Sequence, residues 1–249
     1  MIISNKNFFN NLAPDYDQMV SFEKAVEKKK KLLISFITPG MKYAADLGCG
    51  SGIDSIALTL TGLEVTAFDP SLEMLEVAKK NAEREKTRVT FHNQSIDSIS
   101  EDFDNQFDLV VSLGNTFANI EREQLISSLL RCKQMLKPKG ILLIQVLNYE
   151  KILNEKKRIV NITEGENKYF IRFYDFIGTE IIFNILIFNK EKPSEHKLIS
   201  TKLFPHTQAD FNSALKKIEF DKFEYFSNFN KEIYESEESN DLIVMARKD

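Results

Sequence analysis

The sequence has no tryptophan and, in 249 residues, only two cysteines and three histidines. Cys49 lies in a glycine-rich turn and Cys132 inside a helical pattern. These unlike contexts predict no disulfide framework and favour a reducing compartment, which we take to be the cytoplasm. The histidines have no metal-ligand spacing to one another or to the cysteines, so we expect no metal site.

Long apolar runs and an excess of positive charge are also missing. No run approaches the ~20 apolar residues that a membrane-spanning helix needs, and residues 1–12 lack the pattern of a secretory signal. The formal net charge is −4, whereas nucleic-acid binding needs a basic face. The one basic run, residues 28–31, fits the solvated side of an amphipathic helix. We therefore expect no role on a membrane or on nucleic acid.

Apolar residues are plentiful, and strand-like and helix-like segments alternate from Lys42 to about Leu147. Hydrophobic residues make up 43% of the chain, with twenty phenylalanines among them. The predicted strands are 43–47, 64–68, 88–92, 107–113 and 140–147, and the predicted helices are 53–60, 71–85 and 122–136. The last two strands are apolar on both alternating sets of positions, as in parallel strands covered by helices on each face. We predict an α/β, doubly wound, mostly parallel seven-stranded sheet of Rossmann-like type.

The pattern changes after Asn148. Four successive runs (158–163, 169–177, 180–189 and 197–204) predict antiparallel hairpins inserted into, or laid over, the parallel sheet. A helix at 207–217 and strands at 222–226 and 241–246 follow. We expect a single domain over 1–249, with an N-terminal helical arm (1–41), a cofactor-binding core (42–148), an antiparallel insertion or lid (149–206) and a C-terminal part (207–249).

The most informative segment is A-D-L-G-C-G-S-G at 45–52, between a predicted strand and a predicted helix. A phosphate-binding loop needs Lys-Ser or Lys-Thr after its glycines, and a dinucleotide fingerprint needs G-x-G-x-x-G, but this turn has neither. Asp46 would repel a pyrophosphate and would suit a ligand with an ammonium group. We hypothesise that backbone amides of the turn hold an aminoacyl tail while Asp46 balances its charge. Asp69, at the end of the second strand, is placed to accept hydrogen bonds from ribose hydroxyls, or else to cap the next helix.

These segments resemble the first motifs of class I S-adenosylmethionine-dependent methyltransferases, whose D-x-S-x-x-M-L run is matched at 69–75. The resemblance implies S-adenosylmethionine as cofactor and Met74 against its adenine. The family commonly has Gly-Asp-Ala where this chain has Gln94-Ser95-Ile96, so either Ser95 or Asp97 is expected at the adenine amine. The implied cofactor-binding residues are Tyr16, Asp46, Gly48, Cys49, Gly50, Asp69, Pro70, Met74, Ser95, Ile96, Asp97, Leu113 and Gly114.

Two short segments are similar to glycine and sarcosine N-methyltransferases: L-G-N-T-F-A-N at 113–119 and N-Y-E at 148–150. That family carries an arginine immediately before the second segment to hold the substrate carboxylate, but this chain has Leu147. An apolar side chain cannot hold a carboxylate, so we expect an acceptor other than glycine. Asn115 is expected either to orient the acceptor or to cap a turn. Tyr16 is expected either to close over the sulfonium or to pack the N-terminal arm.

Arg172 and Tyr174 point the same way along a strand, and we hypothesise that they line the acceptor pocket; a subunit interface or a solvated face is the alternative. Substrate-side candidates are Asn115, Asn148, Tyr149, Arg172, Tyr174 and His206. The sequence predicts methyl transfer to a small molecule, an amine before a hydroxyl, by in-line displacement. An NAD-linked oxidoreductase and a non-catalytic S-adenosylmethionine-binding regulator are the alternatives. The acceptor's identity, a general base and assembly into a homo-oligomer stay open.

Overall fold

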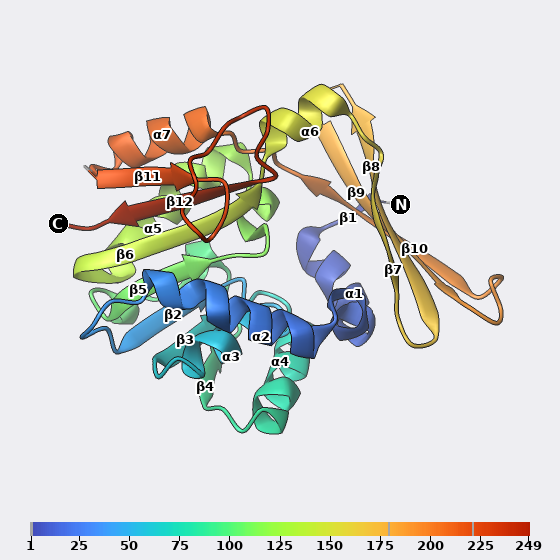
Figure 1. Ribbon diagram of the computed structural model, residues 1–249, viewed down its shortest axis with the longest axis horizontal. Helices are drawn as coiled ribbons and strands as arrows, with labels where there is room; N and C mark the ends of the chain where they lie inside the picture. The colour runs from blue at the N-terminus through green and yellow to red at the C-terminus, as the bar shows by residue number, and fades with distance from the viewer. Residues whose placement is uncertain (1, 179, 221) are drawn as a thin grey trace.

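A seven-stranded sheet forms the centre of the computed structural model, which describes residues 2–178, 180–220 and 222–249. Its strand order is β11-β12-β6-β5-β2-β3-β4 (Figure 1). In that order the strands span Lys222–Phe226, Asp241–Arg247, Leu136–Leu147, Phe107–Ser112, Tyr43–Leu47, Glu64–Phe68 and Val89–His92. The neighbours from β6 to β4 are parallel, while β12 is antiparallel to both β6 and β11. The predicted mostly parallel seven-stranded sheet is confirmed.

Helices cover both faces of this sheet. Helices α2 (Phe22–Leu33), α3 (Ile53–Thr59) and α4 (Leu72–Arg84) lie on one face, and α5 (Leu125–Met135) and α7 (Gln208–Lys217) lie on the other. Strand β5 shows why both faces are apolar. Leu109 and Val111 pack in the cluster that contains residues of α3, whereas Val110 packs in the cluster of α5 and α7. Burial on both sides accounts for the continuous apolar run of this strand.

Two boundaries differ from the sequence prediction. Strand β6 begins at Leu136, where a helix and a loop were expected, because this segment pairs across a bulge: Phe107 aligns with Leu136, and Leu109 already aligns with Ile141. Helix α6 (Tyr149–Glu155) was not predicted. The side chain of Asn148 caps it by accepting a hydrogen bond from the Lys151 amide, 3.3 Å away. The chain therefore turns through a short helix before the insertion starts.

The hairpins after α6 form a second, separate sheet, which we call the insertion sheet, and they do not join the parallel one. Its order is β1-β10-β9-β8-β7. The strands span Ile2–Ile3, His196–Leu203, Glu180–Asn189, Lys168–Ile177 and Ile159–Glu164. Four of them pair antiparallel as predicted, but β1 joins the edge in parallel with β10. The N-terminal arm thus contributes a strand as well as helices, which a two-residue segment could not signal in the sequence.

Helix α1 (Asn5–Val20) lies between the two sheets (Figure 1). Phe8, Leu12 and Met19 pack against the insertion sheet in one buried cluster. On its other side, the Asn81 amide of α4 donates a hydrogen bond of 2.8 Å to Asp17. The helix therefore connects the insertion to the helices beside the carboxyl ends of β2 and β3.

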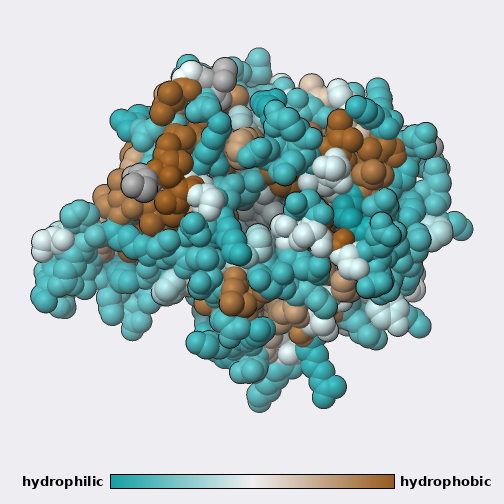
Figure 2. All heavy atoms as spheres, turned by 180° about the vertical axis from the view of Figure 1, so that it is seen from behind, coloured by the Kyte–Doolittle hydropathy of each residue, from teal (hydrophilic) through white to brown (hydrophobic). Residues whose placement is uncertain are grey.

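The insertion sheet also carries exposed apolar side chains. Figure 2 shows hydrophobic residues gathered on the side of the molecule that this sheet forms. Its large exposed apolar residues, among those described, are Ile2, Ile159, Val160, Ile162, Ile177 and Leu198. Such a surface suits burial against another protein, and homo-oligomer formation stays a prediction. In the part of the chain that is described, no helix is long and apolar enough to cross a membrane.

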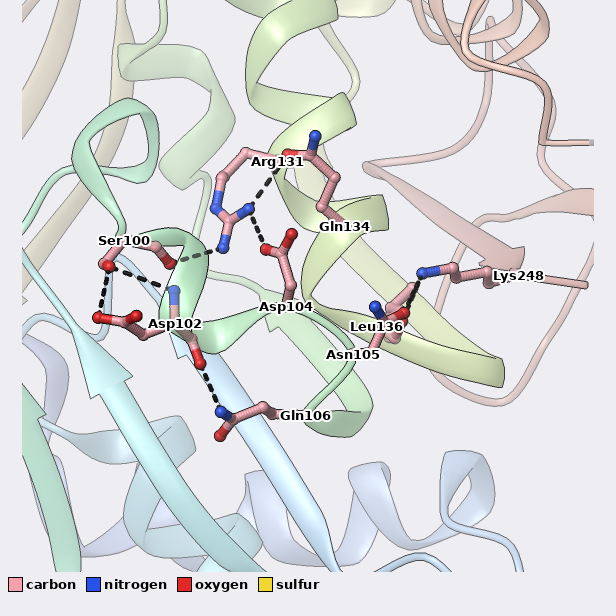
Figure 3. Close-up of polar contacts among 9 residues, drawn as sticks. All are labelled: Ser100, Asp102, Asp104, Asn105, Gln106, Arg131, Gln134, Leu136 and Lys248. Carbon is pink, nitrogen blue, oxygen red and sulfur yellow. Dashed lines mark hydrogen bonds and ion pairs between the residues drawn. The ribbon is translucent and has the colours of Figure 1, made fainter.

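A polar network holds α5 against the connection between β4 and β5 (Figure 3). The side chain of Arg131 is nearly buried and pairs with Asp104, with 2.5 Å between Nη1 and Oδ1. Its Nη2 donates to the Ser100 carbonyl at 2.8 Å. On the same side, the Lys248 ammonium donates to the carbonyl of Leu136 and to the side chain of Asn105. These contacts are structural, because they fix the loop that leads into β5.

We expect Arg131→Ala to lower the free energy of unfolding by about 2 kcal/mol. The change leaves the Ser100 carbonyl and Asp104 without their charged donor, and partial exposure of Asp104 keeps the loss below that of a fully buried pair. Urea unfolding followed by circular dichroism measures the change. Lys192→Ala is the matched control, because its ion pair with Glu195 is exposed on both sides. Equal stability of the two variants would contradict this role of Arg131.

Candidate active site

The glycine-rich turn joins β2 to α3 and is tied to the end of β3. Gly48, Gly50 and Gly52 have φ angles of 74°, 54° and 88°, which side chains rarely adopt. The amides of Gly48 and Cys49 both donate to the Phe68 carbonyl, at 2.7 and 3.1 Å. Backbone shape and hydrogen bonds thus fix the turn before any ligand binds.

Asp69 follows Phe68 and holds the turn from the other side. One carboxylate oxygen accepts from the Gly50 amide and the other from the Ser71 amide, each at 2.8 Å. Burial raises the pKa of Asp69, and these two hydrogen bonds oppose the rise. The cap of α4 is Ser71, whose hydroxyl accepts from the Met74 amide. Asp69 is therefore not the helix cap that the sequence left as an alternative.

A cavity of about 430 Å³ opens above the turn, at the carboxyl ends of β2, β3 and β5. Every residue expected to bind the cofactor lines it, with the single exception of Asp46. Those that line it are Tyr16, Gly48, Cys49, Gly50, Asp69, Pro70, Met74, Ser95, Ile96, Asp97, Leu113 and Gly114. The position fits the rule for doubly wound sheets, in which ligands bind beyond the carboxyl ends of the strands.

Asp46 lies beneath the turn and does not line the cavity. Its carboxylate accepts a hydrogen bond of 2.5 Å from the Ser55 hydroxyl of α3. The hypothesis that turn amides and Asp46 face the ligand is corrected here, because the amides of Gly48, Cys49 and Gly50 have partners within the protein. Besides Asp69 and Asp97, the acid that lines the cavity is Asp54 of α3, whose carboxylate lies 3.0 Å from the Lys29 ammonium.

Burial, with the nearby Asp54 as the second cause, raises the pKa of Asp46 above its ordinary value of 3.8. The folded state therefore holds a proton that the unfolded state releases above about pH 4. Stability contributed by this group falls as pH rises from there towards the raised pKa of the folded state. We expect Asp46→Asn to remove that fall, so that the variant gains stability relative to the parent with rising pH. Urea unfolding of both proteins at several pH values tests this, and parallel pH profiles would contradict it.

A second cavity, of about 260 Å³, lies between α1, the ends of β5 and β6 and the insertion sheet. Of the substrate-side candidates, Asn115, Arg172 and Tyr174 line it. The two cavities share five lining residues, namely Phe9, Tyr16, Val20, Gly114 and Asn119. They therefore meet where the N-terminal helix faces the end of β5.

The other substrate-side candidates line neither cavity. Asn148 is buried, caps α6 and donates to the carbonyls of residues 236 and 239. The Tyr149 hydroxyl accepts from the Asn115 amide at 2.8 Å, so it supports Asn115 from behind. His206 is buried with Nε2 2.9 Å from the Ile120 carbonyl, and burial lowers its pKa. None of these three side chains lines a cavity, although Tyr149 and His206 contact residues that do.

Sequence reasoning missed several lining residues, among them the polar residues Gln145 and Asn119. Gln145 accepts a hydrogen bond of 2.8 Å from the Gly114 amide and donates one of 2.7 Å to Asp241. It thereby fixes the backbone at the junction of the cavities, and a lone polar residue within an apolar strand was its signal in the sequence. Asn119 lines both cavities, and its amide oxygen is buried without a hydrogen-bond partner among the described residues.

Comparison with known proteins identifies methyltransferases as similar proteins. Residues 44–140 match a family described as "Methyltransferase domain". The chain is 24% identical over 246 residues to a glycine/sarcosine N-methyltransferase from Aphanothece halophytica, covering 97% of this chain and 90% of that protein. It is 26% identical over 150 residues to a ubiquinone biosynthesis O-methyltransferase from Coxiella burnetii, covering 60% of this chain and 55% of that protein. A glycine N-methyltransferase from Mus musculus is 31% identical over 143 residues, or 53% and 49% of the two chains. The chain thus spans about half the length of the last two relatives.

The fold has a close counterpart among solved structures. An S-adenosylmethionine-dependent methyltransferase from Clostridium acetobutylicum superposes with a TM-score of 0.76 at 16% identity, covering 96% of this chain and 98% of that one. Fold, cavity position and family match together define a methyltransferase, and hence an enzyme. Within that group, the domain match, the aligned relative and the fold support a class I S-adenosylmethionine-dependent methyltransferase with S-adenosylmethionine as its cofactor.

Proposed function

We propose that the enzyme transfers the methyl group of S-adenosylmethionine, held in the first cavity, to an amine nitrogen of a small acceptor in the second. The observation that carries this proposal is the junction of the two cavities at Tyr16, Gly114 and Asn119. In-line displacement needs the nucleophile and the sulfonium to meet in a water-poor space. At Gly114, φ is 64° and no atom lies within 4 Å of the place a side chain would take, which leaves the junction open.

The lining of the first cavity fits the cofactor. Each carboxylate oxygen of Asp69 has one backbone donor and can accept a second hydrogen bond, which suits the two ribose hydroxyls. The adenine would lie among Met74, Ser95 and Ile96, which line the same cavity. At the turn, Asp54 and Lys29 present one anion and one cation, which complement the ammonium and carboxylate of the methionine part. Bound there, the cofactor supplies an activated methyl group.

The chemistry of the second cavity favours nitrogen over oxygen as the acceptor atom. Its lining, as far as it is described, contains no histidine and no acid. A neutral amine offers its lone pair without help, whereas a hydroxyl needs a base to remove its proton. Burial raises the pKa of Tyr16 to about 12, so this hydroxyl stays protonated near neutral pH and cannot act as that base. The relative that aligns with 97% of this chain is named as an N-methyltransferase, which supports the same choice.

The test combines binding with turnover. Calorimetry should detect binding of S-adenosylmethionine and S-adenosylhomocysteine but not of NAD. Mass spectrometry should then detect methylated products from a panel of small amines and none from the matched alcohols. Methylation of the alcohols alone would overturn the choice of nitrogen. Tight cofactor binding without transfer to any member of a broad panel would favour the regulatory alternative.

A further inference from the structure

The second cavity is largely apolar, and its described lining holds one charged side chain. Phe8, Leu12, Met19, Phe183, Ile185 and Leu203 supply apolar side chains to it. The single side chain of full charge in its described lining is Arg172, on β8. Such a cavity favours a ligand with an apolar body and one group of opposite charge.

Arg172 is held at one end of its guanidinium and unpaired at the other. Its Nε donates to the Asn161 side chain on the neighbouring strand β7, at 2.6 Å. In residues 2–178, 180–220 and 222–249, no carboxylate lies within 4.0 Å of the guanidinium, and no hydrogen bond engages either terminal nitrogen. Asn161 thus orients the side chain and leaves the two terminal groups free to donate to an oxyanion in a bidentate manner.

The surroundings make an unpaired charge costly. Arg172 is partly buried, and burial lowers its pKa, with Tyr16 and Tyr174 as the groups that oppose this. Both tyrosines line the same cavity and both have a raised pKa of about 12, so they are neutral near pH 7. A half-buried cation without an anionic partner is destabilising. A ligand anion would remove that cost.

Position supports the same conclusion. Leu147, at the end of β6, lines this cavity too and brings no charge to it. The positive charge therefore comes to the cavity from the insertion sheet and not from the end of β6. An acceptor held by Arg172 would lie with its apolar body along α1 and β9, where most of the apolar lining is found.

Resting on the proposed function, we propose that the acceptor is an amphipathic acid: an apolar body that carries the amine and one oxyanion, carboxylate or phosphate, bound by Arg172. Simple probes test the charge preference without the true acceptor. 3-Phenylpropanoate, its neutral amide 3-phenylpropanamide, and phenyl phosphate are titrated calorimetrically into the enzyme saturated with S-adenosylhomocysteine. We expect at least one acid to bind about ten- to a hundredfold more tightly than the amide. Whichever of the two acids binds more tightly shows whether the site prefers a carboxylate or a phosphate.

Arg172→Gln should abolish this preference, and Arg172→Lys should keep part of it. Arg158→Gln is the matched control. It removes a positive charge immediately before β7, at a residue that is paired with Asp175 and lines neither cavity. Equal binding of acids and amide, no detectable binding of any probe, or a preference that survives in Arg172→Gln would overturn the proposal. Unchanged binding of S-adenosylhomocysteine by Arg172→Gln shows that the variant is folded. Methyl transfer to neutral amines would then uphold the proposed function even if the acid preference failed.

Discussion

Asp69→Ala is expected to weaken S-adenosylhomocysteine binding by more than about a hundredfold. In the proposed binding mode, the variant loses two charge-assisted hydrogen bonds to the ribose hydroxyls, each of which would contribute about 1.5–3 kcal/mol. It also leaves the amides of Gly50 and Ser71 without the acceptors that now fix the turn to the end of β3. Both effects act on the cofactor and neither acts on the second cavity. Calorimetric titration with S-adenosylhomocysteine measures the loss.

Glu73→Gln is the matched control for charge. Glu73 lies in the first turn of α4, close in sequence to Asp69, but it is exposed, lines neither cavity and makes no side-chain hydrogen bond among the described residues. We expect less than a tenfold change for it, because solvent screens an exposed carboxylate. Asp69→Asn separates the two effects, since it keeps an oxygen for one backbone donor while it removes the negative charge. If both Asp69 variants bound S-adenosylhomocysteine like the parent, Asp69 would not be a cofactor-binding residue.

The parallel core could be predicted from sequence because its signals are local. Runs such as residues 107–113 are apolar on both faces, and the glycines at 48, 50 and 52 mark a turn that only positive φ angles allow. The arrangement of the hairpins could not be predicted in the same way. Whether β7 to β10 join the parallel sheet or form their own depends on long-range pairing, and on a two-residue strand, β1, at the far end of the chain.

The site shows the same division between local and distant information. Spacing along the chain found Asp69 and its neighbours, because the first turn and the second strand end at the same edge of one sheet. Spacing could not predict whether a side chain faces the cavity or lies beneath the turn. Asp46 comes just before the turn in sequence, yet its side chain lies beneath the turn against Ser55. Asp54 lies on α3 and pairs with Lys29 of α2, and their approach follows only from how those helices pack. Arg172 and Tyr174 share a strand face, as predicted. That Tyr16 lines the same cavity depends on how α1 packs against the insertion sheet, which the sequence does not show.

Gly48→Ala should affect both stability and cofactor binding. A Cβ atom at Gly48 would lie 2.3 Å from Cγ2 and 2.7 Å from Oγ1 of Thr116. A left-handed backbone costs alanine about 1–2 kcal/mol, and forced overpacking adds about 1–3 kcal/mol. We expect a loss of about 2–5 kcal/mol in the free energy of unfolding, together with weaker cofactor binding, because Gly48 and Thr116 both line the first cavity. Urea unfolding and calorimetric titration measure the two effects.

Gly62→Ala separates the two causes. Gly62 also has a left-handed backbone, with φ at 98°, but nothing lies within 4 Å of the place its Cβ would occupy. The Gly62→Ala variant should lose only the conformational part of the free energy of unfolding, about 1–2 kcal/mol. It should bind S-adenosylhomocysteine like the parent. In the double variant Gly48→Ala with Thr116→Ala, the nearest clashing atoms are gone, so a non-additive recovery of stability is expected. A strictly additive double variant would show that Thr116 is not the reason why this position must be glycine.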